Sequence, residues 1–246
     1  MGGNCCTGNV DLSDTAVQQT KSKAGLMSSK NSLYFDLQPG KYHPINGMPT
    51  TGDSTTRQAE EKFGPFDWSK TTPSKHPRAF HVGPVQFNGS GVIFSGQAVD
   101  GMKNGIGTQV WPEGSKYEGE WVDGKACGYG RMLHFKGDVY EGQWNDDMAE
   151  GYGVYSHPDG SKYEGNWLRD KQHGKGIETW ENGNRFEGYF KHGEKEGEGK
   201  FTWADGSHFV GEFSNNQING RGKHALTQEN TYGIMDEYTT ANGRTI

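Results

Sequence analysis

The residues with the clearest potential for chemistry stand at the start of the chain, which reads Met1-Gly2-Gly3-Asn4-Cys5-Cys6-Thr7. Removal of Met1 would expose Gly2, the residue that N-myristoylation requires, and Cys5 and Cys6 are placed for palmitoylation. One myristoyl chain binds a membrane only weakly, with a constant of ~10⁴ M⁻¹, so stable anchoring takes a second signal. The usual pattern has Ser or Thr at the sixth position, where this chain has Cys6. We expect lipidation at Gly2, Cys5 and Cys6; the alternative is an unmodified N-terminus with two incidental cysteines.

The remaining sequence shows no arrangement that is typical of catalysis or metal binding. It contains no G-x-G-x-x-G segment and no Gly-Lys followed by Ser or Thr, the patterns of dinucleotide and phosphate loops. No spacing of Cys and His suits zinc. Its many glutamates alternate with other residues, as on a solvated sheet face, and do not form isolated acid/base pairs. We therefore predict a protein that is not an enzyme and that has no catalytic residues, no metal and no cofactor.

Composition and charge restrict the fold and the partners. Hydrophobic residues make up only 30% of the chain, whereas aromatics reach 12% and glycine occurs 39 times, which favours flat aromatic packing over a deep aliphatic core. Residues 1–85 carry a net charge of +2 and residues 86–246 a net charge of −8. An acidic region of this kind is a poor match for nucleic acid or for a generic anionic membrane. The three cysteines do not form a disulfide framework and favour a reducing compartment.

A 23-residue repeat dominates the second half of the chain. Six copies, starting at residues 94, 117, 140, 163, 186 and 209, follow each other without insertion. Each copy has an aromatic-x-Gly-x-aromatic segment, a turn with Gly, Asp or Asn, and a Gly-x-Gly pair. The predicted structural aromatics of the last five copies are Tyr117, Trp121, Tyr140, Trp144, Tyr163, Trp167, Phe186, Phe190, Phe209 and Phe213.

Each repeat reads as a β-hairpin. In the segment that starts at Tyr117 the period is two, so Tyr117, Gly119 and Trp121 share one side of a strand. A turn at Asp123-Gly124 leads to a second strand with its Gly-x-Gly pair. Because one hairpin is marginal in water, the copies must stack. We predict an all-β fold, an elongated single-layer antiparallel sheet of twelve strands and roughly 55–60 Å, with rings lying over the bare Gly-x-Gly backbone.

The same pattern sets the expected boundaries. We expect a mostly disordered N-terminal tail over residues 1–82, a half-repeat cap over 83–93, the array over 94–231 and a C-terminal cap or tail over 232–246. The aromatic cluster at residues 62–68 has two interpretations, either folding back on the array or docking a partner, and the sequence does not separate them. His134 and His157 occupy a position where other copies have Trp, so we interpret them as replacements of a packing aromatic.

The repeat resembles the MORN family (membrane occupation and recognition nexus), whose unit reads approximately Tyr-Glu-Gly-x-Trp, then Gly, His-Gly-x-Gly and Asp-Gly. The resemblance covers residues 94–223. The family histidine appears only at His173, and Asn104, Cys127, Glu150, Glu196 and Asn219 replace it elsewhere. The resemblance implies a scaffold or dimerising module of the kind found in ciliary, flagellar and cortical cytoskeletal assemblies, and phosphoinositide binding has also been attributed to such arrays.

Three functions are therefore expected in order of preference. The first is a non-catalytic scaffold, held at the cytoplasmic face of a membrane by its acylated N-terminus, that presents the array to protein partners. The second is a structural component of a cilium, a flagellum or the cell cortex, bound to a cytoskeletal complex. The third is a phosphoinositide-binding module, which the −8 charge of residues 86–246 disfavours. Homodimerisation is compatible with each of them, and nucleic acid is not an expected partner.

Overall fold

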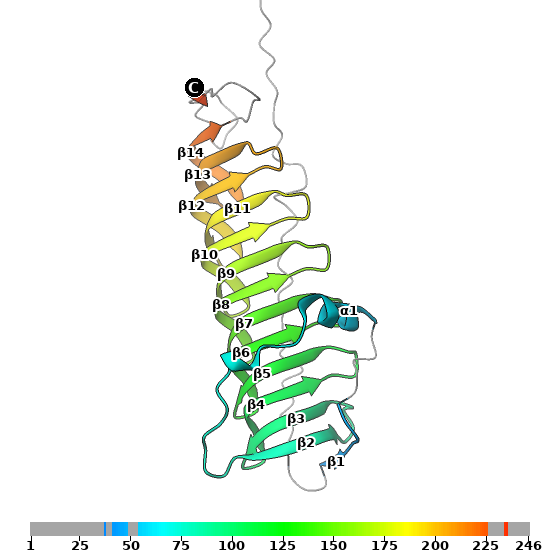
Figure 1. Ribbon diagram of the computed structural model, residues 1–246. Helices are drawn as coiled ribbons and strands as arrows, with labels where there is room; N and C mark the ends of the chain where they lie inside the picture. Colours follow the sequence, from blue (N-terminus) through cyan, green and yellow to red (C-terminus); the bar gives the residue numbers. More distant parts are fainter. Residues whose placement is uncertain (1–36, 38–40, 49–53, 226–233, 236–246) are drawn as a thin grey trace, which may run out of the picture.

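The computed structural model describes residues 37, 41–48, 54–225 and 234–235. These residues form one antiparallel sheet of fifteen strands that follow each other in sequence order, so every strand pairs with its neighbours in the chain. Figure 1 shows the strands stacked along the long axis of the molecule, from β2 at one end to β14 near the other. The all-β, elongated and antiparallel fold expected from the sequence is confirmed.

The strands of the repeats alternate between seven and nine residues. They are β3 (Ile93–Val99), β4 (Met102–Val110), β5 (Lys116–Val122), β6 (Lys125–Leu133), β7 (Val139–Asn145), β8 (Met148–Ser156), β9 (Lys162–Leu168), β10 (Lys171–Thr179), β11 (Arg185–Lys191), β12 (Glu194–Thr202), β13 (His208–Ser214) and β14 (Gln217–Ala225). Outside them lie β1 (Tyr42–Pro44), α1 (Ser54–Phe63), the 3-10 turn η1 (Trp68–Lys70), β2 (Phe80–Phe87) and β15 (Ile234–Met235).

Glycines fix the register of the whole array. One glycine of each strand from β3 to β14 pairs with the equivalent glycine of the next strand. The row contains Gly96, Gly107, Gly119, Gly130, Gly142, Gly153, Gly165, Gly176, Gly188, Gly199, Gly211 and Gly222. Because a slip of one residue would turn every side chain to the wrong side of the sheet, this row and the rings above it hold each strand in place.

Aromatic rings cover the glycine row. A Cβ added to Gly130 would lie 2.4 Å from Oη of Tyr117, and the same distance separates a Cβ at Gly153 from Oη of Tyr140. Each of these tyrosine rings contacts the second aromatic of its own repeat and that of the next repeat, edge to face. Tyr117, for example, contacts Trp121 at 4.9 Å and Trp144 at 5.3 Å between ring centroids. Such edge-to-face pairs are favourable. The core is therefore a continuous ladder of rings along the array.

Each first strand is joined to the second by a two-residue turn in which both residues have positive φ, as for Asp123 (48°) and Gly124 (86°). This is the type I′ geometry that suits the twist of a hairpin. Beyond the turn the register shifts between the pairs Trp121–Ala126 and Gly119–Gly130, so three residues of β6 oppose one of β5. Such a bulge bends the strand, and in Figure 1 the strands curl behind the sheet at this edge.

The described residues before the array include strands and a helix inside the stretch expected as a flexible tail. Strand β2 begins at Phe80, three residues before the expected boundary, and β1 pairs with it through Tyr42 and Phe87. Residues 54–63 form α1, which ends where Gly64 adopts a φ of +70° and donates its N–H to the carbonyl oxygen of Glu60, the usual glycine termination of a helix. Figure 1 shows α1 beside the loop that follows β6 and the chain continuing across the sheet through η1.

At the other end, β15 adds a short strand to β14 through the pairs His224–Met235 and Ala225–Ile234. This strand falls within residues 232–246, where a C-terminal cap was expected. Tyr232 and the remaining residues of that expected cap lie outside the described residues. In the described part of the chain, no helix has the length and apolar character needed to cross a membrane.

Candidate protein-interaction face

The predicted site residues fall into two groups. Gly2, Cys5 and Cys6 lie outside the described residues. The structural aromatics are all buried, with Tyr117, Tyr140 and Phe186 fully inaccessible to solvent. Their polar atoms bond within the sheet: Oη of Tyr117 donates to the carbonyl oxygen of Glu120 at 3.0 Å, and Nε1 of Trp121 donates to that of Gly107 at 3.1 Å. These rings hold the repeats together and do not offer a surface to a partner.

The opposite side of the sheet carries the alternate residues of each strand, and we call it the outer face. Its central row is in cross-strand register from β5 to β13. The row contains Glu118, Arg131, Glu141, Val154, Glu164, Ile177, Glu187, Lys200 and Val210. Acidic residues stand on most first strands, whereas the second strands carry a cation or a β-branched apolar residue.

Residues 54–78, which we call the crossing segment, lie across the outer face of the early repeats. Phe66 is buried there, and its ring stacks on the ring of Tyr129 at 6.1 Å between centroids. The guanidinium of Arg131 lies 5.5 Å from the centroid of the Phe66 ring. Nη1 of Arg131 donates to the carbonyl oxygen of Gly64 at 2.9 Å, and Nη2 donates to Glu118 at 2.8 Å. The aromatic cluster at residues 62–68 thus folds back on the array.

Lys70 adds a charged contact to this interface. Its ammonium donates to Oη of Tyr129 at 3.1 Å and to Oε1 of Glu141 at 3.3 Å, while Tyr129 itself donates to Glu141 at 2.6 Å. The hydrogen bond to Tyr129 raises the pKa of Lys70. Burial, together with the bond to Glu141, raises the pKa of Tyr129. The lysine therefore stays charged and the phenol protonated, as this arrangement of donors requires.

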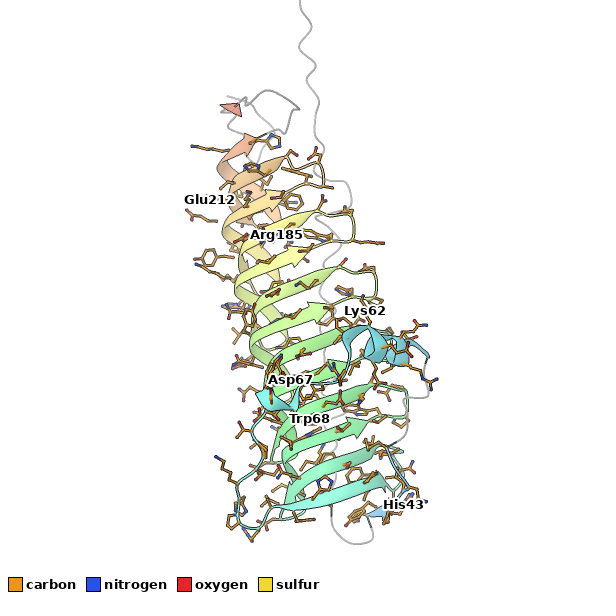
Figure 2. The ribbon with its side chains drawn as sticks, viewed as in Figure 1. His43, Lys62, Asp67, Trp68, Arg185 and Glu212 are labelled. Atoms are coloured by element: carbon orange, nitrogen blue, oxygen red, sulfur yellow. The ribbon has the colours of Figure 1, made fainter. Side chains whose placement is uncertain are left out.

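Further contacts fasten both ends of the crossing segment. On the side of α1, Lys116 forms ion pairs with Glu60 at 3.0 Å and with Glu118 at 2.8 Å. On the other side, the backbone N–H of Ser74 donates to Oε1 of Gln97 at 2.9 Å. Figure 2 shows Asp67 and Trp68 lying over the strands of the early repeats, between α1 and the edge where the strands curl back.

The later repeats leave the outer face open. Glu118 and Arg131 are 8% and 2% exposed beneath the crossing segment, whereas Tyr152 is 52% and Tyr189 43% exposed. Arg185 and Glu212 in Figure 2 belong to this open part, which no described segment crosses. Large exposed aromatics on one face of a rigid sheet are typical of interaction surfaces.

Two buried lysines have structural partners. The ammonium of Lys103 lies 3.7 Å from the centroid of the Trp121 ring and donates to Gln109 at 2.7 Å, and burial lowers its pKa to about 7. Lys195 forms a buried ion pair with Glu178 at 2.5 Å. Each of them has aromatic rings around it, so neither ammonium is open to a substrate. Nowhere in the described part of the chain do three or more His, Cys, Asp or Glu side chains gather as a metal site would need.

The histidines interpreted as replaced aromatics lie at the loops between repeats. Nδ1 of His157 is 2.8 Å from Oδ1 of Asp138 in the preceding loop, and this bond raises the pKa of the imidazole. The ring of His157 also packs edge to face on Tyr155 at 4.8 Å between centroids. Burial lowers the pKa of His134. His157 thus links two neighbouring loops through its hydrogen bond to Asp138, and its ring also packs on an aromatic side chain.

The sequence did not reveal Tyr129, Arg131, Glu141 and Lys70 as an interface. The signal that could have found it is the aromatic cluster at residues 62–68, combined with a tyrosine at the second-strand position of the repeat, where a bare scaffold needs no aromatic. The partners lie 59 to 71 residues apart in the chain, so no local pattern connects them.

Comparisons with known proteins add the following. No curated protein matches the chain in sequence. Among solved structures, the TCP domain of SAS-4 (dCPAP) of Drosophila melanogaster, in complex with a proline-rich motif of Ana2 (dSTIL), is similar with a TM-score of 0.37 and 13% identity, covering 71% of this chain and 92% of that one. The TCP10 domain of Danio rerio CPAP, in complex with a peptide of STIL, has a TM-score of 0.30 and 11% identity, covering 64% of this chain and 73% of that one. With TM-scores below 0.5, neither structure bears on the assignment.

The family model gives the assignment. The MORN repeat matches six consecutive segments, at residues 94–116, 117–139, 140–162, 163–185, 186–208 and 209–225. These starts coincide with the six starts predicted from the sequence, and the segments together span more than half of the chain. The hairpins, the glycine row and the ladder of rings described above are the physical form of these repeats. The chain belongs to the MORN repeat family.

Proposed function

We propose that this protein is a non-catalytic scaffold that is tethered to the cytoplasmic face of a membrane by N-terminal acylation and presents its array to protein partners. Its six MORN repeats suggest a repeat scaffold with a role in protein interaction. The observation that carries the proposal is the crossing segment, an aromatic and basic stretch that the outer face holds through Tyr129, Arg131 and Glu141. A face that binds one such stretch has the chemistry to bind another.

The shape of the array supports this role. A partner peptide meets a rigid surface, because the ring ladder and the paired glycines fix every strand, and a rigid surface loses little entropy on binding. The alternation of Glu187 with Lys200 and Val210 gives charged and apolar contacts at fixed spacing along the open repeats. Alternating contacts of this kind discriminate between partners through both attraction and repulsion.

The scaffold function can be tested with charge reversal on the outer face. In the double variant Glu164→Lys with Glu187→Lys, proteins that co-purify with the full chain should be depleted by about tenfold in quantitative mass spectrometry. The matched control reverses two exposed charges, Glu181→Lys in the loop after β10 with Glu194→Lys at the first residue of β12, and should retain its partners. An unchanged set of co-purifying proteins in the outer-face variant would contradict the proposal.

The membrane tether has its own test. Gly2→Ala should move the protein from the membrane fraction to the soluble fraction, and Cys5→Ser with Cys6→Ser should give a partial shift, because one acyl chain alone binds only weakly. Gly3→Ala is the matched control and should remain on membranes. If Gly2→Ala fractionates with membranes as the parent chain does, acylation at Gly2 is not the anchor.

A further inference from the structure

The contact made by Tyr129 has an uncovered counterpart one repeat further on. Tyr152 stands 23 residues after Tyr129 and Glu164 stands 23 residues after Glu141. Oη of Tyr152 donates to Oε1 of Glu164 at 2.7 Å, just as Tyr129 donates to Glu141 at 2.6 Å. Tyr129 is half-buried under Phe66, whereas Tyr152 is 52% exposed. The second tyrosine–glutamate pair has the same geometry without a covering ring.

The surface around Tyr152 is more apolar than the covered one. Val154 stands where the first site has Arg131, and Ile177 follows it in register on β10. Both are half-buried, and the exposed ring of Tyr189 lies on the next strand. An aromatic ring placed over Tyr152 would rest on Val154 and would bury apolar surface that is now in water.

The carboxylate of Glu164 is prepared for a cation. Lys162 contacts Oε2 at 2.8 Å, and Tyr152 donates to Oε1. In the covered site the corresponding Oε1 of Glu141 accepts from both Tyr129 and Lys70. The bonds from Lys162 and Tyr152 hold the pKa of Glu164 below its ordinary value, so this carboxylate is ionised at neutral pH. By analogy with Glu141, Oε1 of Glu164 can accept from an ammonium while it accepts from Tyr152.

Other described repeats do not reproduce this pair. The position of Tyr129 and Tyr152 is taken by Ile106, Lys175 and Glu198 in three other repeats. Lys175 lies 5.5 Å from the centroid of the Tyr189 ring, so there the array supplies its own cation. Among the described residues, no cation of the array lies over the ring of Tyr152, although Lys162 pairs with Glu164.

We propose that Tyr152, Val154 and Glu164 form a docking site for an extended peptide of a partner protein that carries an aromatic residue and, about four residues later, a lysine. The pattern comes from Phe66 and Lys70, whose interface this site continues directly. Charge favours it as well, because residues 86–246 carry −8 while the crossing segment, with five basic and three acidic residues, carries +2. The proposal rests on the scaffold function and names the chemistry of one partner.

A second copy of this chain is a poorer occupant. Its own Phe66 and Lys70 are already bound to its own Tyr129 and Glu141. An attached peptide has an effective concentration near the millimolar range, far above that of a separate copy in solution. A peptide of another protein does not first have to be released from a site in its own chain, so it binds the open site more readily than a second copy does.

The test uses the full chain and a synthetic peptide with the sequence of residues 63–71, Phe-Gly-Pro-Phe-Asp-Trp-Ser-Lys-Thr, as the probe. Saturable binding is expected by calorimetry, and Tyr152→Ala should weaken it by about tenfold or more, since one aromatic stack and one hydrogen-bonded partner are lost. Tyr152→Phe, which keeps the ring, should weaken it less. Tyr189→Ala removes another exposed ring on the same face and should bind as the parent chain does. Probes in which Lys70→Glu or Phe66→Ala is introduced should fail to bind.

Two outcomes would overturn the proposal: no saturable binding, or equal binding by the Tyr152→Ala variant. If Tyr129→Ala loses binding while Tyr152→Ala does not, the probe displaces the crossing segment. Because Tyr152 is exposed, its variants should melt as the parent chain does, so misfolding is recognised directly. If the probe fails while partners still depend on Glu164 and Glu187, this site fails and the scaffold function stands; if both fail, the scaffold function fails too.

Discussion

At the scale of single residues, the positions of the glycine row require glycine because a side chain would collide with the aromatic rings above them, and not only because of the backbone conformation. Gly130 pairs with Gly119 on one side and with Gly142 on the other. A Cβ there would lie 2.4 Å from Oη and 2.6 Å from Cζ of Tyr117, which is far inside van der Waals contact. The ring cannot withdraw, because it is fully buried and its hydroxyl is bonded to Glu120.

We therefore expect Gly130→Ala to destabilise the protein by about 2 kcal/mol or more, as overpacking in a filled core does. The midpoint of urea unfolding, followed by circular dichroism, measures the effect. Gly83→Ala in β2 is the matched control, since a Cβ there meets nothing within 4 Å, and it should change the midpoint very little. Equal midpoints for the two variants would show that the ring does not need the bare backbone.

The turn residue Asp170 is partly buried, so its negative charge destabilises the folded state. Its Oδ1 accepts from the backbone N–H of Ala149 at 2.7 Å, which joins two repeats. Burial, and to a lesser degree the charge of Asp147, raises its pKa from 3.8 to about 6. A raised pKa means that the folded state binds the proton more tightly than the unfolded state does. The stabilising contribution is thus complete below pH 3.8 and is lost as the pH rises through about 6.

Asp170→Asn should relieve this cost while it keeps an acceptor for Ala149, as Asn216 does for the N–H of Lys195 at 2.9 Å. We expect a gain of about 1 kcal/mol at pH 8, reduced for solvent screening of a partly exposed group, and little gain at pH 4. Urea unfolding at the two pH values measures it. Asp159→Asn, in an exposed turn, controls for net charge. A gain that is the same at both pH values would contradict the assigned cause.

At the scale of elements, the crossing segment is a separate layer on a sheet that is otherwise a single layer. It is held by one buried ring, Phe66, by hydrogen bonds that involve Arg131 and Lys70, and by polar contacts at its two ends. The helix α1 contributes Ala59, which packs against Leu133 and Val139 at the loop after β6. The array beneath has its own core on the other side of the sheet, so the two layers should come apart independently.

Phe66→Ala should release the segment while the array stays folded. Removing a buried phenylalanine typically costs about 3–5 kcal/mol, which is enough to open a short segment. We expect trypsin to cut near Lys70 and Lys75 about tenfold faster or more, with the melting of the array little changed. Phe63→Ala is the control, because Phe63 is 37% exposed. A cleavage rate that does not change would show that Phe66 is not the anchor.

At the scale of the whole molecule, the repeats are interchangeable units. Each one contacts its neighbours through the same glycine pair, the same ring contacts and the same turn, so stability should be close to a sum over units and interfaces. The unit at residues 140–162 can be replaced by the next one almost group for group. Glu164 would take the place of Glu141, Trp167 that of Trp144, and Asp170 that of Asp147.

Deletion of residues 140–162 should therefore leave a folded array that is shorter by two strands, or about 10 Å. Small-angle scattering gives the maximum dimension and circular dichroism the strand content. Deletion of residues 140–150, which removes half a unit, should abolish cooperative folding, because it breaks the phase of glycines and rings. A folded product from the half-unit deletion would mean that the register is not set by the row of glycines.

The sequence alone determined the all-β class, the six repeats and their phase, the turn positions and the rings that form the core. These features rest on contacts inside a repeat or between adjacent repeats, and a period of 23 residues displays such contacts directly. The two-residue turns that were predicted from Gly, Asp and Asn have positive φ at Gly101, Gly124, Asp147 and the three equivalent positions. The bulge beside each turn was not predicted from the sequence, because it depends on how two strands pair.

Only the tertiary structure decided which part of the outer face the crossing segment covers and which part no described segment covers. Arg131 reaches Gly64 across 67 residues of sequence, and Lys70 reaches Glu141 across 71; contacts at such separations leave no periodic trace. Tyr129 and Tyr152 look alike in the sequence, yet one is covered by Phe66 and the other is exposed. The difference arises because a non-repeating segment of finite length crosses only the early repeats, and this leaves the rest of the outer face open.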